Sequence, residues 1–149
     1  GGITEENQIS ICLSPEHKTC KILQIQDIYS KYGRCSTCCM IDYVGIASGN
    51  DIADKFTKAG FTATKSEFVN APVINELAVC VECKIIDFNE ETCILRGEIV
   101  NVSVDELCIT GDKVDISKVQ PLCFDPFNRA YHVMGEKVGE AWGSGTELM

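Results

Sequence analysis

Five cysteines fall into two close-set groups, and cysteine thiolates bind zinc or carry redox chemistry. Cys35, Cys38 and Cys39 stand in the stretch GRCSTCCM, and Cys80 and Cys83 stand in CVEC. Together they offer two CxxC pairs, the format of a four-thiolate zinc site. The gap between the pairs is much longer than in a compact zinc ribbon, and the second pair falls on an expected strand. A thioredoxin-like site requires a CxxC pair that opens a helix, and we expect neither pair to do so. A small zinc protein therefore stays an alternative with weak support.

The sequence contains no motif of a hydrolase. The histidines are His17 and His132, and neither HExxH nor GxSxG occurs. We therefore predict no catalytic side chain and no metal ligand. A phosphate could instead be bound by Lys18 and Thr19, through an ammonium group and a hydroxyl. The alternative is that these two residues belong to a solvated loop.

A second candidate anion site lies in SGNDIADKFTKAGF, which predicts a short helix with Ser48 or Asn50 as N-cap and Gly60 as its stop. Ser48, Gly49 and Asn50 lead into this helix, whose first amides would point outward and bind an anion. Lys55 could supply the matching positive charge. The alternative is an ordinary capped helix with an exposed lysine.

The elements that must position these residues are mostly strands. Apolar residues alternate with polar ones in QISICLS, LAVCVECKIIDF and CILRGEIVNVSVDEL, a pattern typical of strands with one buried face. The last two stretches predict an antiparallel pair around DFNEET, with a kink at Gly97. Cys80 and Cys83 would face opposite sides of their strand, and the stretches APVI and QPLCFDPFN are expected to be connections. The chain is therefore expected to be mainly β, a barrel or sandwich with one or two short helices.

Composition narrows the class of protein. A chain of 149 residues has the size of one domain, spanning residues 1–149. Its formal charge of −9 offers no basic surface for nucleic acid or an anionic membrane. With no long apolar run and no secretion signal, we expect a cytoplasmic protein in which the ten cysteines are reduced.

Read in order, five stretches together resemble the flavin reductase-like, FMN-binding split-barrel family, in its flavoredoxin-like branch. The stretches are ISICLSPEHKT, DYVGIASGNDIADKFTKAGFTATKSEFVNAPVINEL, VECKI, GEIVNVSVDE and VDISKVQPLCFDPFNRAYHVMGEKVGEA. The resemblance implies a Greek-key split β-barrel that forms a homodimer, with FMN in a groove between the subunits. It also implies an NAD(P)H:flavin oxidoreductase, with NAD(P)H as reductant, or an electron carrier on bound FMN. The alternative is a noncatalytic remnant of the same fold, a binding module that has lost flavin.

The resemblance also implies where the cofactor would lie. Lys18 and Thr19 would be at the phosphate end of the flavin. The same groove would be lined by Ser48, Gly49, Asn50 and Lys55. Tyr131 and His132 would approach it from the carboxyl-terminal part of the chain. Family members carry a further amino-terminal strand and loop that contact the flavin ring, so we expect this domain to be truncated at its amino end.

One segment departs from the family. The stretch CKILQIQDIYSKYGRCSTCCMI stands where the family has a buried strand. One permitted codon set for DIYSKYGRCSTCC, read one base later, encodes IFTVSMADVAHVV, an apolar and β-branched strand of the expected kind. We therefore hypothesise a local frameshift across about residues 20–41, testable by resequencing. Cys35, Cys38 and Cys39 would then be accidents of the reading frame and not ligands.

Overall fold

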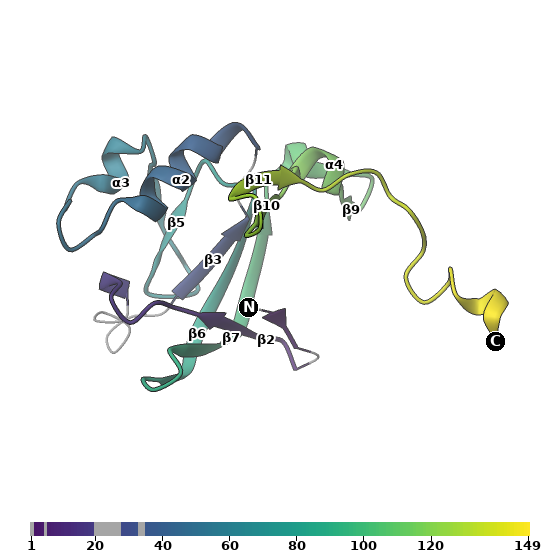
Figure 1. Ribbon diagram of the computed structural model, residues 1–149, viewed down its shortest axis with the longest axis horizontal. Helices are drawn as coiled ribbons and strands as arrows, with labels where there is room; N and C mark the ends of the chain where they lie inside the picture. Colours follow the sequence, from purple (N-terminus) through teal and green to yellow (C-terminus); the bar gives the residue numbers. More distant parts are fainter. Residues whose placement is uncertain (1, 5, 20–27, 33–34) are drawn as a thin grey trace.

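A five-stranded antiparallel sheet forms the centre of the protein, in the order β1-β2-β7-β6-β3 (Figure 1). The computed structural model describes residues 2–4, 6–19, 28–32 and 35–149, with the backbone alone for 28–32 and 35. The strands of the sheet are β1 (Gly2–Ile3), β2 (Gln8–Cys12), β3 (Ile28–Tyr32), β6 (Val79–Asn89) and β7 (Ile94–Val104).

Three small hairpins and several short helices complete the fold. The hairpins are β4 (Ala63–Lys65) with β5 (Pro72–Ile74), β8 (Ile109–Thr110) with β9 (Lys113–Val114), and β10 (Leu122–Asp125) with β11 (Ala130–Val133). The α-helices that the structure describes in full are α2 (Cys38–Ile46), α3 (Lys55–Lys58) and α4 (Ile116–Val119), and the described 3₁₀ turns are η1 (Cys35–Thr37), η2 (Glu106–Cys108) and η3 (Thr146–Leu148). The expected mainly β fold with short helices is confirmed. No helix in the described ranges is long and apolar enough to cross a membrane.

The longest strands, β6 and β7, form the antiparallel pair that the alternating sequence predicts. The register shifts between Ile85 and Asp87, opposite Gly97 and Arg96. The irregularity predicted at Gly97 is therefore present, and the extra residue, Ile86, stands on the β6 side. Such a bulge bends the strand and increases its twist.

The core is built on β6, and it differs from the sequence expectation in one respect. Ile9 of β2 packs with Val81 and Cys83, and Ile11 joins this cluster from the same side of β2. Period-2 alternation predicts one buried face, yet Cys80 and Glu82 on the other face are also only 2% exposed. Both faces are covered here because the segment of Ser66 packs over the second one, a long-range contact that strand periodicity does not encode.

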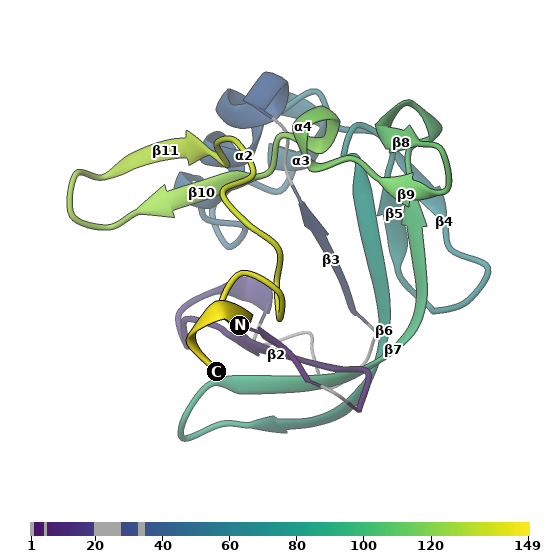
Figure 2. The same ribbon diagram turned by 90° about the vertical axis from the view of Figure 1, so that its right-hand side faces the viewer.

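A second core cluster lies at the end of the β6–β7 pair where β6 begins and β7 ends. Ala78 just before β6, Cys108 of η2 and Val119 of α4 are each at most 2% exposed and pack together. Both views place α2, α3, α4 and the β10–β11 hairpin at this end of the sheet (Figures 1 and 2). This end therefore carries most of the residues that the sequence singles out.

Some local expectations are wrong. The helix predicted to begin at Ser48 or Asn50 is shortened to α3, which begins at Lys55, while the stop at Gly60 (φ +82°) is confirmed. The proline-punctuated stretches expected to be connections contain the strands β5 and β10. Both strands are short and lie in two-stranded hairpins, the edge positions that a sheet leaves open to proline.

The frameshift hypothesis falls in part on residues 20–27 and 33–34, which lie outside the described residues. Of the same segment, residues 28–32 form β3, which pairs antiparallel with β6. Cys35 lies in η1 and Cys38 and Cys39 open α2, so the expectation that neither CxxC pair opens a helix is wrong for the first pair. The hypothesis about the reading frame stays a prediction for resequencing.

Candidate functional site

The carboxyl end of α2 is held by the side chain of Lys55. The Lys55 Nζ atom donates hydrogen bonds to the carbonyl oxygens of Val44 (2.9 Å) and Ala47 (2.8 Å). A helix leaves its last carbonyls without partners in the helix, and a cation near them also interacts favourably with the helix dipole. Lys55 thereby fixes α3 to the end of α2 and uses two of its three N–H groups.

Gly49 lies between two lysine side chains. A Cβ atom built on Gly49 would lie 3.4 Å from Cδ of Lys18 and 3.5 Å from Cε of Lys55. Two segments distant in sequence therefore meet here: the segment of Lys18 after β2, and the continuous stretch from the loop after α2 into α3. The contacts at Gly49 are made by the apolar stems of the two lysines. We call Lys18, Gly49 and Lys55 the lysine cluster.

The loop that carries Gly49 is closed by its own hydrogen bonds. The carbonyl oxygen of Ser48 accepts from the backbone N–H groups of Asp51 (3.2 Å) and Ile52 (2.9 Å). The Asn50 N–H donates to Ser48 Oγ (3.2 Å), and Asn50 Nδ2 donates to the carbonyl oxygen of Glu16 (3.2 Å). The helix expected to begin at Ser48 or Asn50 is therefore absent here, since these amides close a turn, and anion binding at this loop stays a prediction. Ser48 and Asn50 instead shape the loop and tie it to the turn that holds Lys18.

Tyr131 contacts the same helix at another point. The Tyr131 hydroxyl donates to Asp42 Oδ1 (3.0 Å), and this hydrogen bond to the Asp42 carboxylate, with partial desolvation, raises the pKa of Tyr131. Asp42 lies five residues before Ala47, about 7 Å along the helix axis from the end that Lys55 holds. The tyrosine thus docks the β10–β11 hairpin onto α2.

His132 and Thr19 are not joined to the lysine cluster by contacts among the described residues. His132 Nε2 lies 3.6 Å from Asp125 Oδ2 across its own hairpin, and its side chain is 63% exposed. Thr19 follows Lys18 in the chain and is exposed. The structure therefore brings Lys18, Gly49 and Lys55 together, with Ser48 and Asn50 behind them. The roles of Thr19 and His132 stay predictions.

The pair Cys80 and Cys83 belongs to no metal site among the described residues. Among the described residues, no group of three or more His, Cys, Asp and Glu side chains could hold a metal ion. Cys83 is fully buried, and this burial, with the nearby Cys80 and Glu82, raises the pKa of its thiol to about 11. A thiol with such a pKa is not ionised at neutral pH, so Cys83 behaves as an apolar core residue.

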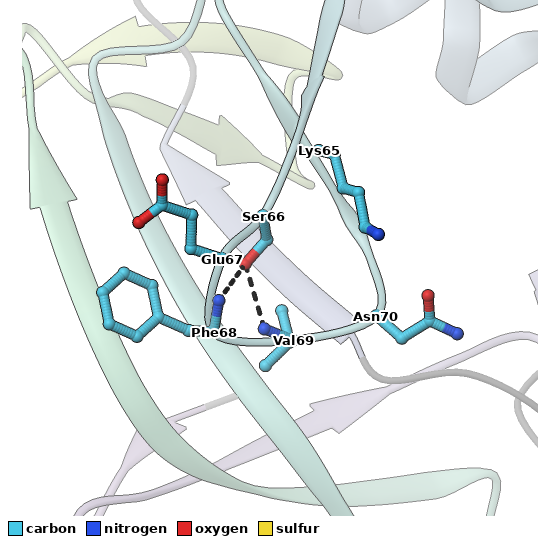
Figure 3. Close-up of a pocket in the computed structure, with 6 residues that line it drawn as sticks. All are labelled: Lys65, Ser66, Glu67, Phe68, Val69 and Asn70. Atoms are coloured by element: carbon cyan, nitrogen blue, oxygen red, sulfur yellow. Dashed lines mark hydrogen bonds between the residues drawn. The ribbon is translucent and has the colours of Figure 1, made fainter.

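Sequence reasoning missed a buried polar group behind the loop 65–70. Glu82 accepts hydrogen bonds from Ser66 Oγ and from Asn101 Nδ2. Ser66 Oγ in turn accepts from the N–H groups of Phe68 (2.9 Å) and Val69 (3.0 Å), so the loop closes on it (Figure 3). The one available signal was a glutamate in the middle of an apolar strand.

The same loop, residues 65–70, lines a hollow of about 510 Å³. Figure 3 shows these six side chains spread around the turn that Ser66 closes. Residues 65–70 supply the whole lining of this hollow, and no residue of the lysine cluster contributes to it. The hollow is therefore separate from the candidate site. The candidate site remains the lysine cluster at the end of α2.

Comparison with solved structures gives close matches. The flavoredoxin of Desulfovibrio vulgaris (Miyazaki F) is 32% identical, with a TM-score of 0.89 over 97% of this chain and 80% of that one. A flavoredoxin from Methanosarcina acetivorans is 24% identical, with a TM-score of 0.82 over 95% and 75% of the two chains. An FMN-binding domain of a flavin reductases-like enzyme from Shewanella baltica OS155 is 15% identical, with a TM-score of 0.79 over 90% and 74%. No protein-family model and no curated protein matches the chain.

Proposed function

Since this chain belongs to the flavin reductase-like, FMN-binding split-barrel family, we propose that it is a flavoprotein that binds FMN and transfers electrons. The family is shown by the flavoredoxin of 32% identity, of which the chain covers 80%. Within this proposal the protein is either an NAD(P)H:flavin oxidoreductase or a flavoredoxin-like electron carrier. The observation that carries the proposal is the meeting of Lys18 and Lys55 around Gly49.

The residues of the lysine cluster fit a phosphate monoester, the charged end of FMN. A phosphate needs cations and hydrogen-bond donors, and in an acidic chain these must be supplied locally. Lys18 is exposed and carries an ammonium group on a long stem. Lys55 has one further N–H besides the two that bind carbonyl oxygens. Gly49, without a side chain, lets a ligand approach the backbone closely.

Bound FMN would supply the redox chemistry, since its ring accepts a hydride without a protein acid or base. The chain's own residues would bind and orient the group. Lys18 would neutralise the phosphate, and Lys55 would keep the end of α2 in place beneath it. Asn50 would hold the loop of Gly49 against the turn of Lys18, through its bond to the Glu16 carbonyl.

The test is a titration of the purified protein with FMN, followed by the quenching of flavin fluorescence. We expect saturable one-to-one binding. Replacing Lys18 by Ala removes a charge-assisted contact worth about 1.5–3 kcal/mol, so the Kd should rise roughly ten- to a hundredfold. Lys58→Ala is the matched control, because Lys58 pairs with Asp54 at 3.3 Å and its side chain is 57% exposed. Equal affinities of the two variants would count against the lysine cluster as the phosphate site.

A second assay separates the two activities. Oxidation of NADH and of NADPH is measured with free FMN in excess. Turnover with either nucleotide supports the reductase, and its absence in a protein that binds FMN supports the electron carrier. A folded protein that binds no FMN would favour the noncatalytic remnant of the same fold.

A further inference from the structure

One face of the β10–β11 hairpin carries a thiol, an imidazole and a carboxylate. Cys123 of β10 lies directly opposite His132 of β11 in the antiparallel register, and Asp125 lies two residues further along β10, on the same face. Side chains directly opposite in such a pair have Cβ atoms about 4.5–5.5 Å apart, and diagonal neighbours lie about 7–8 Å apart. The three side chains therefore form one cluster, which we call the thiol cluster.

The other face of the hairpin is fixed to the body of the protein. Tyr131 precedes His132 and so points to the other side of β11, where its hydroxyl donates to Asp42 of α2 (3.0 Å). The ring of Phe124, the cross-strand partner of Tyr131, packs against the tyrosine ring with centroids 5.7 Å apart. The hairpin extends outward from the rest of the protein (Figure 2). Cys123 is a free and exposed cysteine, so a reagent in solution can reach it.

Asp125 is held as a carboxylate beside His132. Its Oδ2 atom accepts from Asn128 Nδ2 (2.7 Å), and its Oδ1 atom accepts from the Phe127 N–H (2.8 Å). These hydrogen bonds, with the nearby His132, lower the pKa of Asp125. The same Oδ2 atom lies 3.6 Å from His132 Nε2. A carboxylate at this distance stabilises the imidazolium form of the ring and leaves Nδ1 as the nitrogen that can take up a proton.

A thiol next to a base that is in turn stabilised by a third group is the arrangement of an activated nucleophile. Only the thiolate attacks an electrophile, and an unassisted thiol is mostly protonated at neutral pH. Here the His132 imidazole can accept the proton of Cys123, and Asp125 offsets the positive charge that forms on the ring. Among the described residues, no group of three or more His, Cys, Asp and Glu side chains could hold a metal ion, so the cluster offers proton and sulfur chemistry.

We propose that Cys123 is a thiol–disulfide exchange site that reacts with small disulfides from solution. The Cys123 thiolate attacks one sulfur of the disulfide, whose S–S bond breaks while a new S–S bond forms to Cys123. The second sulfur leaves as a thiolate and takes the proton held by His132. The products are a mixed disulfide on the protein and one free small thiol, and an excess of small thiol reverses the reaction. The exchange requires no bound FMN, so the proposal stands apart from the proposed function.

The probe for the test is hydroxyethyl disulfide, because it is small and uncharged. Flavin-free protein is mixed with the probe at pH 7, quenched with acid at timed intervals and digested with pepsin, and mass spectrometry assigns the modified cysteines. Cys12 is the internal control, since it is also free and exposed and has Ile94 as its cross-strand partner. A positioned general base accelerates such a step by about a hundredfold or more, so Cys123 should react roughly tenfold faster than Cys12, or faster still.

Two variants of the hairpin separate the imidazole from its surroundings. His132→Gln changes a side chain that is 63% exposed, so the fold should be kept, and the reaction at Cys123 should slow roughly tenfold or more. Arg129→Gln is the matched control, because it removes a positive charge from an exposed position of the same hairpin and leaves the imidazole in place. In both variants the rate at Cys12 should equal that of the wild type.

Four results would overturn the proposal. The first is a wild-type protein in which Cys123 reacts no faster than Cys12. The second is a His132→Gln variant in which Cys123 reacts as fast as in the wild type. The third is an equal loss of rate at both cysteines in that variant, which would show that the effect is not local. The fourth is an equal loss at Cys123 in Arg129→Gln, which would assign the effect to charge and not to a base.

Discussion

Replacing Lys55 by Met tests whether this lysine supports the fold of the candidate site. Met keeps the apolar stem beside Gly49 but removes the ammonium group that binds the carbonyl oxygens of Val44 and Ala47. Hydrogen bonds to a charged group contribute about 1.5–3 kcal/mol each. Lys55 is only half-buried, so water replaces part of both, and we expect a total loss of about 2–3 kcal/mol.

This loss is a large fraction of the stability of an ordinary domain, which is about 5–15 kcal/mol. In a domain of this size, 1 kcal/mol corresponds to about 2–4 °C in the midpoint of thermal unfolding. The Lys55→Met variant should therefore unfold roughly 5–10 °C below the wild type. Thermal unfolding is followed by far-ultraviolet circular dichroism, with a urea titration to obtain the free energy of unfolding.

Lys58→Met is the control for this experiment. Lys58 lies on the same short helix and pairs with Asp54 at 3.3 Å, with side chains 57% and 62% exposed. Such an exposed pair contributes about 0.3–0.5 kcal/mol, so its midpoint should move by less than about 2 °C. Equal shifts for the two variants would refute the role of Lys55 at the end of α2, as would an unchanged midpoint for Lys55→Met.

Two further predictions follow from shifted pKa values. Hydrogen bonds from Ser117 and from the Thr110 hydroxyl (2.7 Å) lower the pKa of Asp115 from 3.8 to about 2. The ionised Asp115 carboxylate therefore stabilises the folded protein above about pH 4, and this stabilisation is lost as the pH falls toward 2. The unfolding midpoints of wild type and Asp115→Asn should converge over that interval, and a carboxyl titration by NMR centred at 3.8 would contradict the assignment. Burial raises the pKa of Cys83 to about 11. Iodoacetamide at pH 8 should therefore modify the exposed Cys123 and leave Cys83 unmodified until the protein is unfolded. Mass spectrometry that finds equal modification of both cysteines in the native protein would contradict this prediction.

The strands of the central sheet could be predicted because their signal is local. The alternation of Ile9 and Ile11 with polar neighbours appears directly as the buried side of β2, and the pattern around Val81 appears as β6. The glycine at position 97 likewise marked the site of the bulge. A period of two residues fixes which side chains share a face, whatever the rest of the chain does. The ordered motifs also identified the family, which the flavoredoxin comparison bears out.

The candidate site was predicted in part. Lys18, Gly49 and Lys55 were singled out by residue type and by resemblance, and they do lie together. Their roles could not be read from the sequence, however. The helix expected from Ser48 is limited to one turn there, in which the N–H groups of Asp51 and Ile52 both donate to the Ser48 carbonyl, and regular helix begins only at Lys55. Propensity is a weak prior over so short a segment, where a few side-chain and turn contacts outweigh it.

The sequence alone determined the β-strand pattern, the acidic charge and the residue types available to bind a phosphate. Tertiary structure alone decided which of those residues meet and what each one binds. Tyr131 and Asp42 form a hydrogen bond although 89 positions separate them, and Lys55 gives two of its N–H groups to the end of a helix. It also decided that Glu82 is buried and that Trp142 is not. The physical reason is that burial and long-range hydrogen bonds depend on how separate elements pack, whereas periodicity and charge belong to the chain itself.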